Sequence, residues 1–141
     1  LALHDNALLE IVDEYAEFTN VMQTVWPNVI LQQQSNTLAT RQIITRGVGE
    51  FELVWTFFGY ADDTDEMTRL RLRQANLMGP AGYVSVDDSE VMKYLEQGIA
   101  PYPEATSVLE MGGRDWHDET HIITEAAIRA FYDHYRKVME L

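Results

Sequence analysis

The clearest capacity for chemistry lies in two adjacent carboxylates, Asp87 and Asp88, which follow the run Gly-Pro-Ala-Gly-Tyr-Val-Ser-Val at residues 79–86. One carboxylate together with two histidines forms the facial triad of nonheme Fe(II) enzymes, which leaves coordination positions open for dioxygen. The alternative is structural, because aspartate at a helix N-terminus accepts a free backbone N–H. Spacing alone favours the cap. The two roles are compatible if Asp87 caps a helix while Asp88 faces a metal.

His117 and His121 are four residues apart and could face the same side of a helix, as in zinc enzymes. Asp115, Asp118 and Glu119 offer oxygen ligands nearby. The zinc motif, however, has glutamate directly after its first histidine, and Asp118 stands there instead. A surface pair without a metal is the favoured interpretation, and a metallohydrolase is the alternative.

A run of glutamines occupies an expected strand, and alternation places Gln32 and Gln34 on one face and Gln33 on the other. Amides on a cavity-lining face could orient a polar aromatic substrate; otherwise this is an ordinary strand edge. Arg41, on the next strand, could pair bidentately with a substrate carboxylate or lie on the surface. For the aromatic side chains of this region we expect a position in the core, with a pocket-lining position as the alternative; they are Trp55, Phe57, Phe58 and Tyr60.

Apolar spacing predicts the end of a helix at residues 17–25, stopped by Pro27. Strands are expected at residues 28–34, 37–45 and 51–60, the last two paired as an antiparallel hairpin across the glycines of residues 46–50. Strands followed by helices without regular alternation indicate an α+β fold with an antiparallel sheet and flanking helices.

Three helices are expected in the second half of the chain. The first begins at a capping box of Asp63 and Glu66 and ends at Gly79, where glycine would adopt the left-handed conformation. A short second helix is expected to begin near Asp87 or Asp88 and to end at Gly98. After an irregular stretch at residues 99–114, a third is expected at residues 121–139. Its supporting pairs would be Glu125 with Arg129 and Asp133 with Lys137.

The composition limits the class of protein. The 141 residues carry 10 basic and 23 acidic side chains, a net charge of 10 − 23 = −13, which argues against nucleic acid or an anionic membrane surface as a partner. Apolar runs fall short of the ~20 residues that span a bilayer, and a signal-peptide pattern is absent. The chain has no cysteine, so disulfides and cysteine ligation of an iron–sulfur cluster are excluded within it, as suits a cytoplasmic protein.

Several stretches together resemble a known family. They are Trp-Pro-Asn-Val-Ile-Leu-Gln-Gln-Gln at residues 26–34 with residues 37–41, Gly-Glu-Phe-Glu-Leu-Val-Trp-Thr-Phe-Phe-Gly-Tyr at residues 49–60, the run of residues 73–88, and residues 124–135. They resemble the large (alpha) subunits of Rieske-type aromatic-ring-hydroxylating oxygenases, and among these the subunits acting on anthranilate, salicylate or related aromatic acids. The segment from Gly79 to Asp88 is the most specific part.

The resemblance implies that residues 1–141 are the C-terminal portion of the catalytic domain, which has a helix-grip (START-like, Bet v 1-like) fold. It implies that Asp88 is the carboxylate ligand of a mononuclear Fe(II). Substrate-pocket positions would be Met78 and Val84, with Ile30, Gln32 and Gln34 as further candidates. The Rieske domain with its [2Fe–2S] cluster, and the segment that supplies the two iron histidines, are absent from this chain.

The function that follows from the resemblance is hydroxylation of an aromatic carboxylic acid with O2. Electrons would come from NADH through a reductase, with or without a ferredoxin, and the Rieske cluster. Other alpha subunits in a trimer, and small beta subunits, are the implied partners. The alternative from another class is a helix-grip module that binds a ligand without redox chemistry. A hydrolase with its metal at His117 and His121 is the third.

Overall fold

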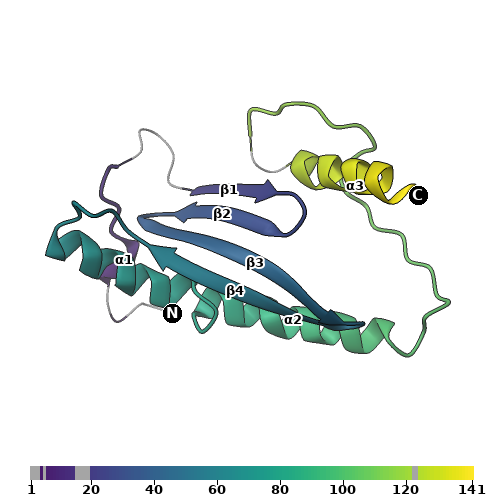
Figure 1. Cartoon of the computed structure of the whole chain (residues 1–141), viewed down its shortest axis with the longest axis horizontal. Helices are drawn as coiled ribbons and strands as arrows, with labels where there is room; N and C mark the ends of the chain where they lie inside the picture. The colour runs from purple at the N-terminus through teal and green to yellow at the C-terminus, as the bar shows by residue number, and fades with distance from the viewer. Residues whose placement is uncertain (1–3, 5, 15–19, 122–123) are drawn as a thin grey trace. The chain divides into compact units, whose positions relative to one another are not determined.

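The computed structural model describes the whole chain except residues 1–3, 5, 15–19 and 122–123 (Figure 1). The chain divides into two compact units, Leu1–Pro103 and Glu104–Leu141. The first unit contains a short 3-10 helix η1 (Asn6–Leu9), a sheet and two helices, and the second contains one helix. The α+β class with an antiparallel sheet and flanking helices is thus confirmed.

The sheet has four antiparallel strands in the order β1-β2-β3-β4, with each neighbour connected by a hairpin. The strands are β1 (Asn20–Val25), β2 (Val29–Gln34), β3 (Thr37–Gly47) and β4 (Glu50–Phe58). The three strands expected at residues 28–60 are confirmed, and so is the hairpin between the last two. Residue-by-residue pairing holds along β2 and β3, and a register shift interrupts β3 and β4 only near their shared turn.

The expected helix at residues 17–25 is wrong where the structure describes it. Residues 20–25 form strand β1, which pairs from Asn20 with Gln34 through Val25 with Val29. Val21, Thr24 and Val25 are β-branched residues, which suit a pleated strand, and the partner β2 supplies hydrogen bonds that no helical pattern predicts. Residues 17–19 lie outside the described residues.

The two faces of the sheet differ in burial. Cross-strand pairing puts alternate residues on one face, here called the inner face: Met22 of β1, Ile30, Gln32 and Gln34 of β2, Thr37, Ala39 and Arg41 of β3, and Leu53, Trp55 and Phe57 of β4. Along β4 the inner-face residues are half-buried, while Val54 and Phe58 on the outer face are exposed. The inner face is therefore the covered one.

Helix α1 (Asp65–Met78) packs against β3 and η1, and helix α2 (Tyr83–Ile99) follows it along the sheet (Figure 1). Helix α1 begins one residue later than the expected capping box allows. Thr64 is its N-cap and accepts the N–H of Met67 through its hydroxyl at 3.2 Å. Asp63 therefore does not cap the helix and is free to bind elsewhere.

The turn between α1 and α2 depends on two glycines. Gly79 ends α1 as expected, but its φ of −75° is not left-handed. Its role is close packing, because a Cβ there would come within 2.6 Å of the Ala75 carbonyl oxygen. At Gly82 a Cβ would come within 2.1 Å of the Leu77 carbonyl oxygen, so only glycine permits α2 to begin directly against the last turn of α1.

The second unit consists of an irregular segment and helix α3 (Ala126–Met139). The helix begins five residues later than expected, at Glu125 as N-cap with a φ of 53°. The pair of Asp133 and Lys137 is confirmed at 2.7 Å. The expected pair of Glu125 and Arg129 is wrong, since the buried Arg129 guanidinium donates to the carbonyl oxygens of Met111, Asp115 and Thr124 instead.

In the part of the chain that the structure describes, none of the helices is both long enough and apolar enough to cross a bilayer.

Candidate functional site

Asp88 lies in the second turn of α2, five residues after its first residue Tyr83. The expected cap at Asp87 or Asp88 is wrong, because Gly82 is the N-cap and the apolar run at residues 83–86 forms the first turn. The physical reason is that Gly82 packs on α1 and starts α2 earlier than any acidic cap. Helix α2 also continues past the expected stop at Gly98 to Ile99.

Asp88 is an exposed carboxylate on helix α2. It lies four residues after Val84 and four before Met92, so it shares a stripe with these apolar residues and with Leu95. Asp87 lies about 100° away around the helix. Asp87 likewise lies four residues after Tyr83 and four before Val91, and both carboxylates are exposed, so the two differ only in the direction in which they leave the helix.

Arg41 on β3 is a basic residue whose pKa is affected by the charge of Asp88. Burial lowers the pKa of the Arg41 guanidinium, and the negative charge of Asp88 acts in the opposite direction. The guanidinium carbon lies 4.7 Å from the centroid of the Trp55 ring, and Nη2 lies 3.4 Å from the sulfur of Met22. Its Nε is buried without a hydrogen-bond partner among the described residues. Arg41 is therefore a half-buried cation whose described contacts are mainly soft and aromatic.

The three β2 positions expected in a pocket lie together on the inner face. Ile30 pairs with Arg41, and Gln32 pairs with Ala39. Gln32 donates its Nε2 hydrogen to Oε1 of Gln34 at 2.7 Å. Gln33 lies on the outer face, as alternation predicted. Amide groups and the guanidinium of Arg41 thus share one surface.

Met78 and Val84 lie on either side of the turn between α1 and α2. Met78 is the last residue of α1 and is half-buried, and its carbonyl oxygen accepts the hydroxyl of Ser85 at 2.9 Å. Val84 is 44% exposed, one turn before Asp88. Both residues therefore belong to the same end of α2 as Asp88.

The expected aromatic group divides between the two faces of the sheet. Trp55 and Phe57 lie on the inner face and stack at 5.6 Å, and Phe57 reaches the turn at Gly79. Phe58 and Tyr60 are about half exposed, so for them the expected core position is wrong. Arg41, Trp55 and Phe57 form a continuous surface from the middle of the sheet to the start of α2.

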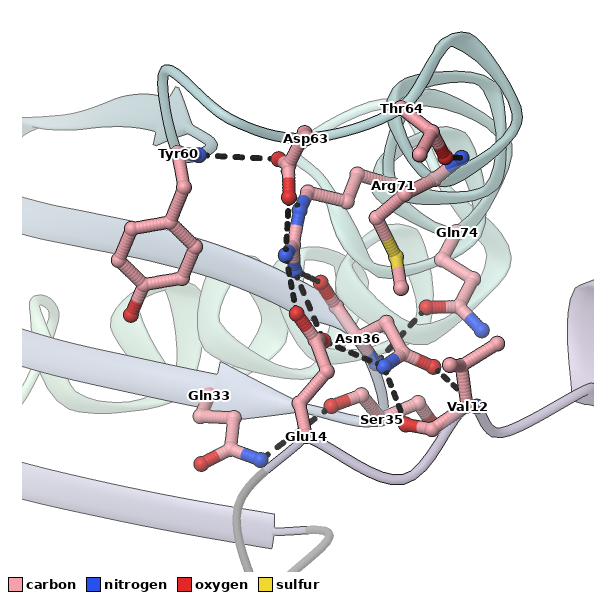
Figure 2. A network of polar contacts seen from close by, with 11 residues as sticks. Val12, Glu14, Gln33, Ser35, Asn36, Tyr60, Asp63, Thr64, Arg71 and Gln74 are labelled. Atoms are coloured by element: carbon pink, nitrogen blue, oxygen red, sulfur yellow. Dashed lines mark hydrogen bonds and ion pairs between the residues drawn. The ribbon is translucent and has the colours of Figure 1, made fainter.

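A second polar assembly surrounds Arg71 on α1, a residue that motif analysis missed (Figure 2). This Arg71 cluster consists of Glu14, Asn36, Asp63, Arg71 and Gln74. Arg71 donates to Asp63 at 2.8 and 2.9 Å, to both carboxylate oxygens of Glu14, and to the Asn36 carbonyl oxygen. Gln74 accepts the Asn36 N–H at 2.9 Å and donates to the Glu10 carbonyl oxygen at 2.7 Å.

The electrostatics of the Arg71 cluster follow from these contacts. The Arg71 hydrogen bonds lower the pKa of Asp63, and the Tyr60 N–H, at 2.9 Å, adds to the effect. The Asp63 hydrogen bond, followed by the contacts of Glu14, raises the pKa of Arg71 well above its usual value. The cluster fastens residues 10–14 and the β2–β3 turn to α1.

A sequence signal for the Arg71 cluster does exist. Leu70, Arg71, Gln74 and Leu77 fall on one stripe of α1, and Leu70, Arg71 and Gln74 are buried. Polar residues within an apolar helical stripe indicate buried partners, because an unpaired buried charge is costly. The sequence does not identify those partners, because residues 14, 36 and 63 come together with α1 only in the folded structure.

Two cavities lie elsewhere in the described residues. One, of about 350 Å³, lies between α1 and the ends of β3 and β4 and is lined by Leu38, Phe57 and Leu72, among others. Another, of about 520 Å³, lies within the second unit beside Trp116, Arg129 and Tyr132. Neither cavity is lined by Asp88, Arg41 or the glutamines.

The alternative metal site at His117 and His121 does not have the required helix. Both histidines precede α3 in irregular chain, and His117 Nε2 lies 3.0 Å from a Glu119 carboxylate oxygen. Across the described ranges, groups of three or more metal-ligating side chains are absent. The zinc-type geometry that motivated this alternative is therefore wrong.

Comparison with known proteins decides the relationship. The large oxygenase component of a salicylate 5-hydroxylase from a Ralstonia species is 48% identical over 141 residues. The anthranilate 1,2-dioxygenase large subunit of Burkholderia cepacia is 45% identical over 138 residues. The chain is similar to one part of such large oxygenase subunits. A terephthalate 1,2-dioxygenase terminal oxygenase component, subunit alpha 2, from a Comamonas species is 40% identical over 138 residues.

These matches cover 97–99% of the chain and confirm the resemblance found in the sequence. The chain spans about one third of the length of these relatives, 33% in each case. No protein-family model matches it.

The residues present fit the implied metals only in part. Asp88 offers one exposed carboxylate, whose charge acts on the half-buried Arg41, and a single carboxylate suits one oxygen ligand of a mononuclear iron. Histidine partners for Asp88 are not found among the described residues. The chain has no cysteine, so the cysteine ligands of a Rieske cluster are not among its 141 residues.

Proposed function

We propose that this chain is the C-terminal portion of the catalytic domain of a Rieske-type large oxygenase subunit, with a helix-grip fold. The enzyme hydroxylates an aromatic carboxylic acid with O2. The observation that carries the proposal is the 40–48% identity of nearly the whole chain to large oxygenase subunits. Within the chain, Asp88 on α2 lies close enough to Arg41 on the inner face for its charge to act on the half-buried guanidinium. Between them they provide a metal ligand and an anion site on neighbouring elements.

Asp88 is the proposed carboxylate ligand of a mononuclear Fe(II), with two histidines supplied from outside this chain. When bound, the iron supplies the activation of O2. Asp88 contributes a negative charge at a fixed place on a regular helix. Its neighbours along the helix, Val84 and Met92, are 44% and 42% exposed, so the carboxylate is accessible to a metal whose other ligands come from outside this chain.

Arg41 is the proposed anchor for the carboxylate of the substrate. Burial disfavours its charge and a buried Nε–H is unpaired among the described residues, so an incoming carboxylate would gain a charge-assisted hydrogen bond there. Trp55 holds the guanidinium from its ring face at 4.7 Å and fixes its direction. The substrate ring would then lie over the inner face, towards α2.

The remaining pocket residues surround this position. Ile30 pairs with Arg41 and offers an apolar wall, and Gln32 and Gln34 offer polar atoms beside it. Met78 and Val84 border the start of α2, where Asp88 lies one turn further. These five residues would set the orientation of the ring relative to the iron ligand.

The whole enzyme requires parts outside this chain. A Rieske [2Fe–2S] cluster would deliver electrons that come from NADH through a reductase, with or without a ferredoxin. Large subunits would associate as trimers, with or without small beta subunits. We propose a cytoplasmic location, which suits a chain of this composition with no cysteine among its 141 residues.

The deciding experiment replaces Asp88 with alanine in the full-length large subunit and measures mononuclear iron content, the Rieske absorption spectrum and oxidation of aromatic acids. We expect less than about a tenth of the wild-type iron, since loss of a ligand exceeds the tenfold effects known for residues around a metal. The Rieske spectrum should be unchanged. Asp87→Ala is the matched control, because Asp87 points about 100° away on the same helix.

Retained iron and turnover in Asp88→Ala would overturn the proposal for this residue. A protein that binds aromatic acids but neither binds iron nor oxidises them in its wild-type form would instead be a ligand-binding module. The same preparations therefore separate the two classes of function.

A further inference from the structure

Arg129 on helix α3 is a buried cation that is held by carbonyl oxygens. It is 7% exposed. Its Nε–H donates to the Asp115 carbonyl oxygen at 2.7 Å, and Nη1 donates to the carbonyl oxygens of Met111 and Thr124. Within the described part of the chain, no carboxylate forms an ion pair with this guanidinium, and Nη2 donates no hydrogen bond. A buried charge is costly unless an opposite charge neutralises it, so the free edge of Arg129 is suited to an anion.

The cavity of about 520 Å³ in the second unit has a wall rich in positive charge. Three of the ten basic residues of the chain line it: Arg114, Arg129 and Arg136. Asp115 and Asp133 also line it, but Lys137 Nζ lies 2.7 Å from Asp133 Oδ2 and neutralises that carboxylate. The arginines therefore outnumber the remaining carboxylate. In a chain with a net charge of −13, such a concentration of cations around one cavity favours an anionic ligand.

Two aromatic side chains complete the same wall. Trp116 and Tyr132 line the cavity and are 51% and 42% exposed. The Trp116 Nε1–H donates to Asp133 Oδ2 at 3.3 Å, which holds the indole in place, and the Tyr132 ring meets the Phe131 ring edge-on at 5.6 Å. Exposed rings of this kind offer flat apolar surfaces to the ring of a ligand. The volume of the cavity lies within the range of about 300–1,000 Å³ that is usual for small-molecule sites.

We propose that this cavity binds a small aromatic molecule that bears a phosphate or another doubly charged oxyanion. The oxyanion would accept hydrogen bonds from Nη2 of Arg129 and from the guanidinium groups of Arg114 and Arg136, since arginine matches the geometry of phosphate oxygens. The ring would lie against Trp116 and Tyr132. The site needs neither iron nor the residues around Asp88, so it is a second site that stands apart from the proposed function.

The test measures binding of phenyl phosphate and of inorganic phosphate to the full-length large subunit by calorimetry. We expect phenyl phosphate to bind at least about fivefold more tightly, because only it can stack on the aromatic wall. Arg136→Met, at an exposed position in the last turn of α3, should weaken phenyl phosphate at least about fivefold through loss of a charge-assisted hydrogen bond. Arg46→Met is the matched control, since it removes an exposed arginine of the sheet. Arg41→Met should also keep the wild-type affinity, which separates this cavity from the proposed substrate site.

The aromatic part of the site has its own variant. Trp116→Leu should weaken phenyl phosphate and leave inorganic phosphate unchanged, because only the first of these ligands has a ring. Hydrogen exchange in the wild type locates the site without any substitution. Phenyl phosphate should slow amide exchange in residues 111–116 and in α3, and leave the strands of the sheet unchanged.

Three results would overturn the inference. A wild-type subunit that binds neither phosphate would mean that Arg129 serves only to anchor the loop whose carbonyl oxygens it contacts. Equal weakening of phenyl phosphate by Arg136→Met and Arg41→Met would place the binding outside this cavity. Slower exchange confined to residues other than 111–136 would do the same, and it remains decisive even if a substituted protein fails to fold.

Discussion

Two groups of buried polar side chains, one centred on helix α1 and one on the inner face of the sheet, differ in how completely their hydrogen-bonding groups are paired. In the Arg71 cluster one guanidinium donates to two carboxylates and a carbonyl oxygen. On the inner face the Arg41 guanidinium lies on an aromatic ring and a sulfur atom, and a nearby glutamine carbonyl has no partner in the described residues. Both arginines carry the same group, so the surroundings account for the contrast.

The difference indicates separate roles. A saturated network of buried charges has no bonding capacity left for a ligand, and it fixes the segments that it joins. Unpaired buried donors and acceptors can still form hydrogen bonds with a ligand, as a binding site requires. The Arg71 cluster is therefore a structural fastening, and the inner face is where a ligand is expected.

Removing the positive charge of the Arg71 cluster should have the largest effect on stability. In Arg71→Met the Glu14 and Asp63 carboxylates would remain partly buried without a positive charge, and we expect a loss of about 3–5 kcal/mol in the free energy of unfolding. Urea unfolding of the full-length subunit, followed by far-ultraviolet circular dichroism, measures it. Arg69→Met is the control, since Arg69 is exposed on the same helix. A loss equal to that of the control would mean that the cluster contributes nothing to stability.

A second break removes an uncharged member of the same cluster. Asn36 is 1% exposed, donates to Val12 and Glu14, and accepts the Val12 N–H. For Asn36→Ala we expect a loss of about 2–3 kcal/mol, because several buried partners lose their hydrogen bonds together. Asn28→Ala removes an exposed hydrogen bond to the Ile43 carbonyl oxygen and should cost less than about 1 kcal/mol by the same unfolding measurement. Equal losses in the two variants would contradict this account.

Acid should lower the stability that the Arg71 cluster contributes by a smaller amount. The folded-state pKa of Asp63 lies below its ordinary value of about 3.9, so its contribution to stability is present above that value. The contribution is lost as the pH falls through the lower, folded-state pKa. Unfolding midpoints of the wild type and Asp63→Asn, measured from pH 6 downwards, should converge in acid. Parallel curves at every pH would show that Asp63 does not carry this dependence.

Most of the sheet could be predicted from the sequence, and the termini of the helices could not. β-Branched and aromatic residues between turn residues predict the strands of residues 29–58. The alternation of Gln32, Gln33 and Gln34 correctly predicts which face of the sheet each side chain occupies. Strand β1 was mistaken for a helix because its apolar residues also fit helical spacing, and the hydrogen bonds that decide between the two come from β2. Asp87 and Asp88 suggested a helix start, but packing of Gly82 on α1 moved the start to Tyr83.

The candidate site was predicted as a set of residues but not as an arrangement. Motif resemblance selected Asp88, Met78, Val84 and the β2 residues, and strand alternation gave the common face of Gln32 and Gln34. The electrostatic effect of Asp88 on Arg41 depends on how α2 lies relative to the sheet, which no local sequence pattern contains. The Arg71 cluster was missed for the same reason, since its members come from positions 14, 36, 63, 71 and 74.

The smallest effect on stability is expected for Arg41, the arginine of the inner face. Arg41→Met removes a half-buried cation that has no carboxylate hydrogen-bonded to it in the described residues, and methionine can fill the space beside Trp55. The free energy of unfolding should therefore change by less than about 1 kcal/mol. Affinity of the iron-loaded subunit for benzoate-type acids, measured by calorimetry, should fall at least about tenfold, because the carboxylate loses a charge-assisted hydrogen bond. A variant that unfolds as readily as Arg71→Met, or that binds the acids unchanged, would remove the distinction between the two arginines.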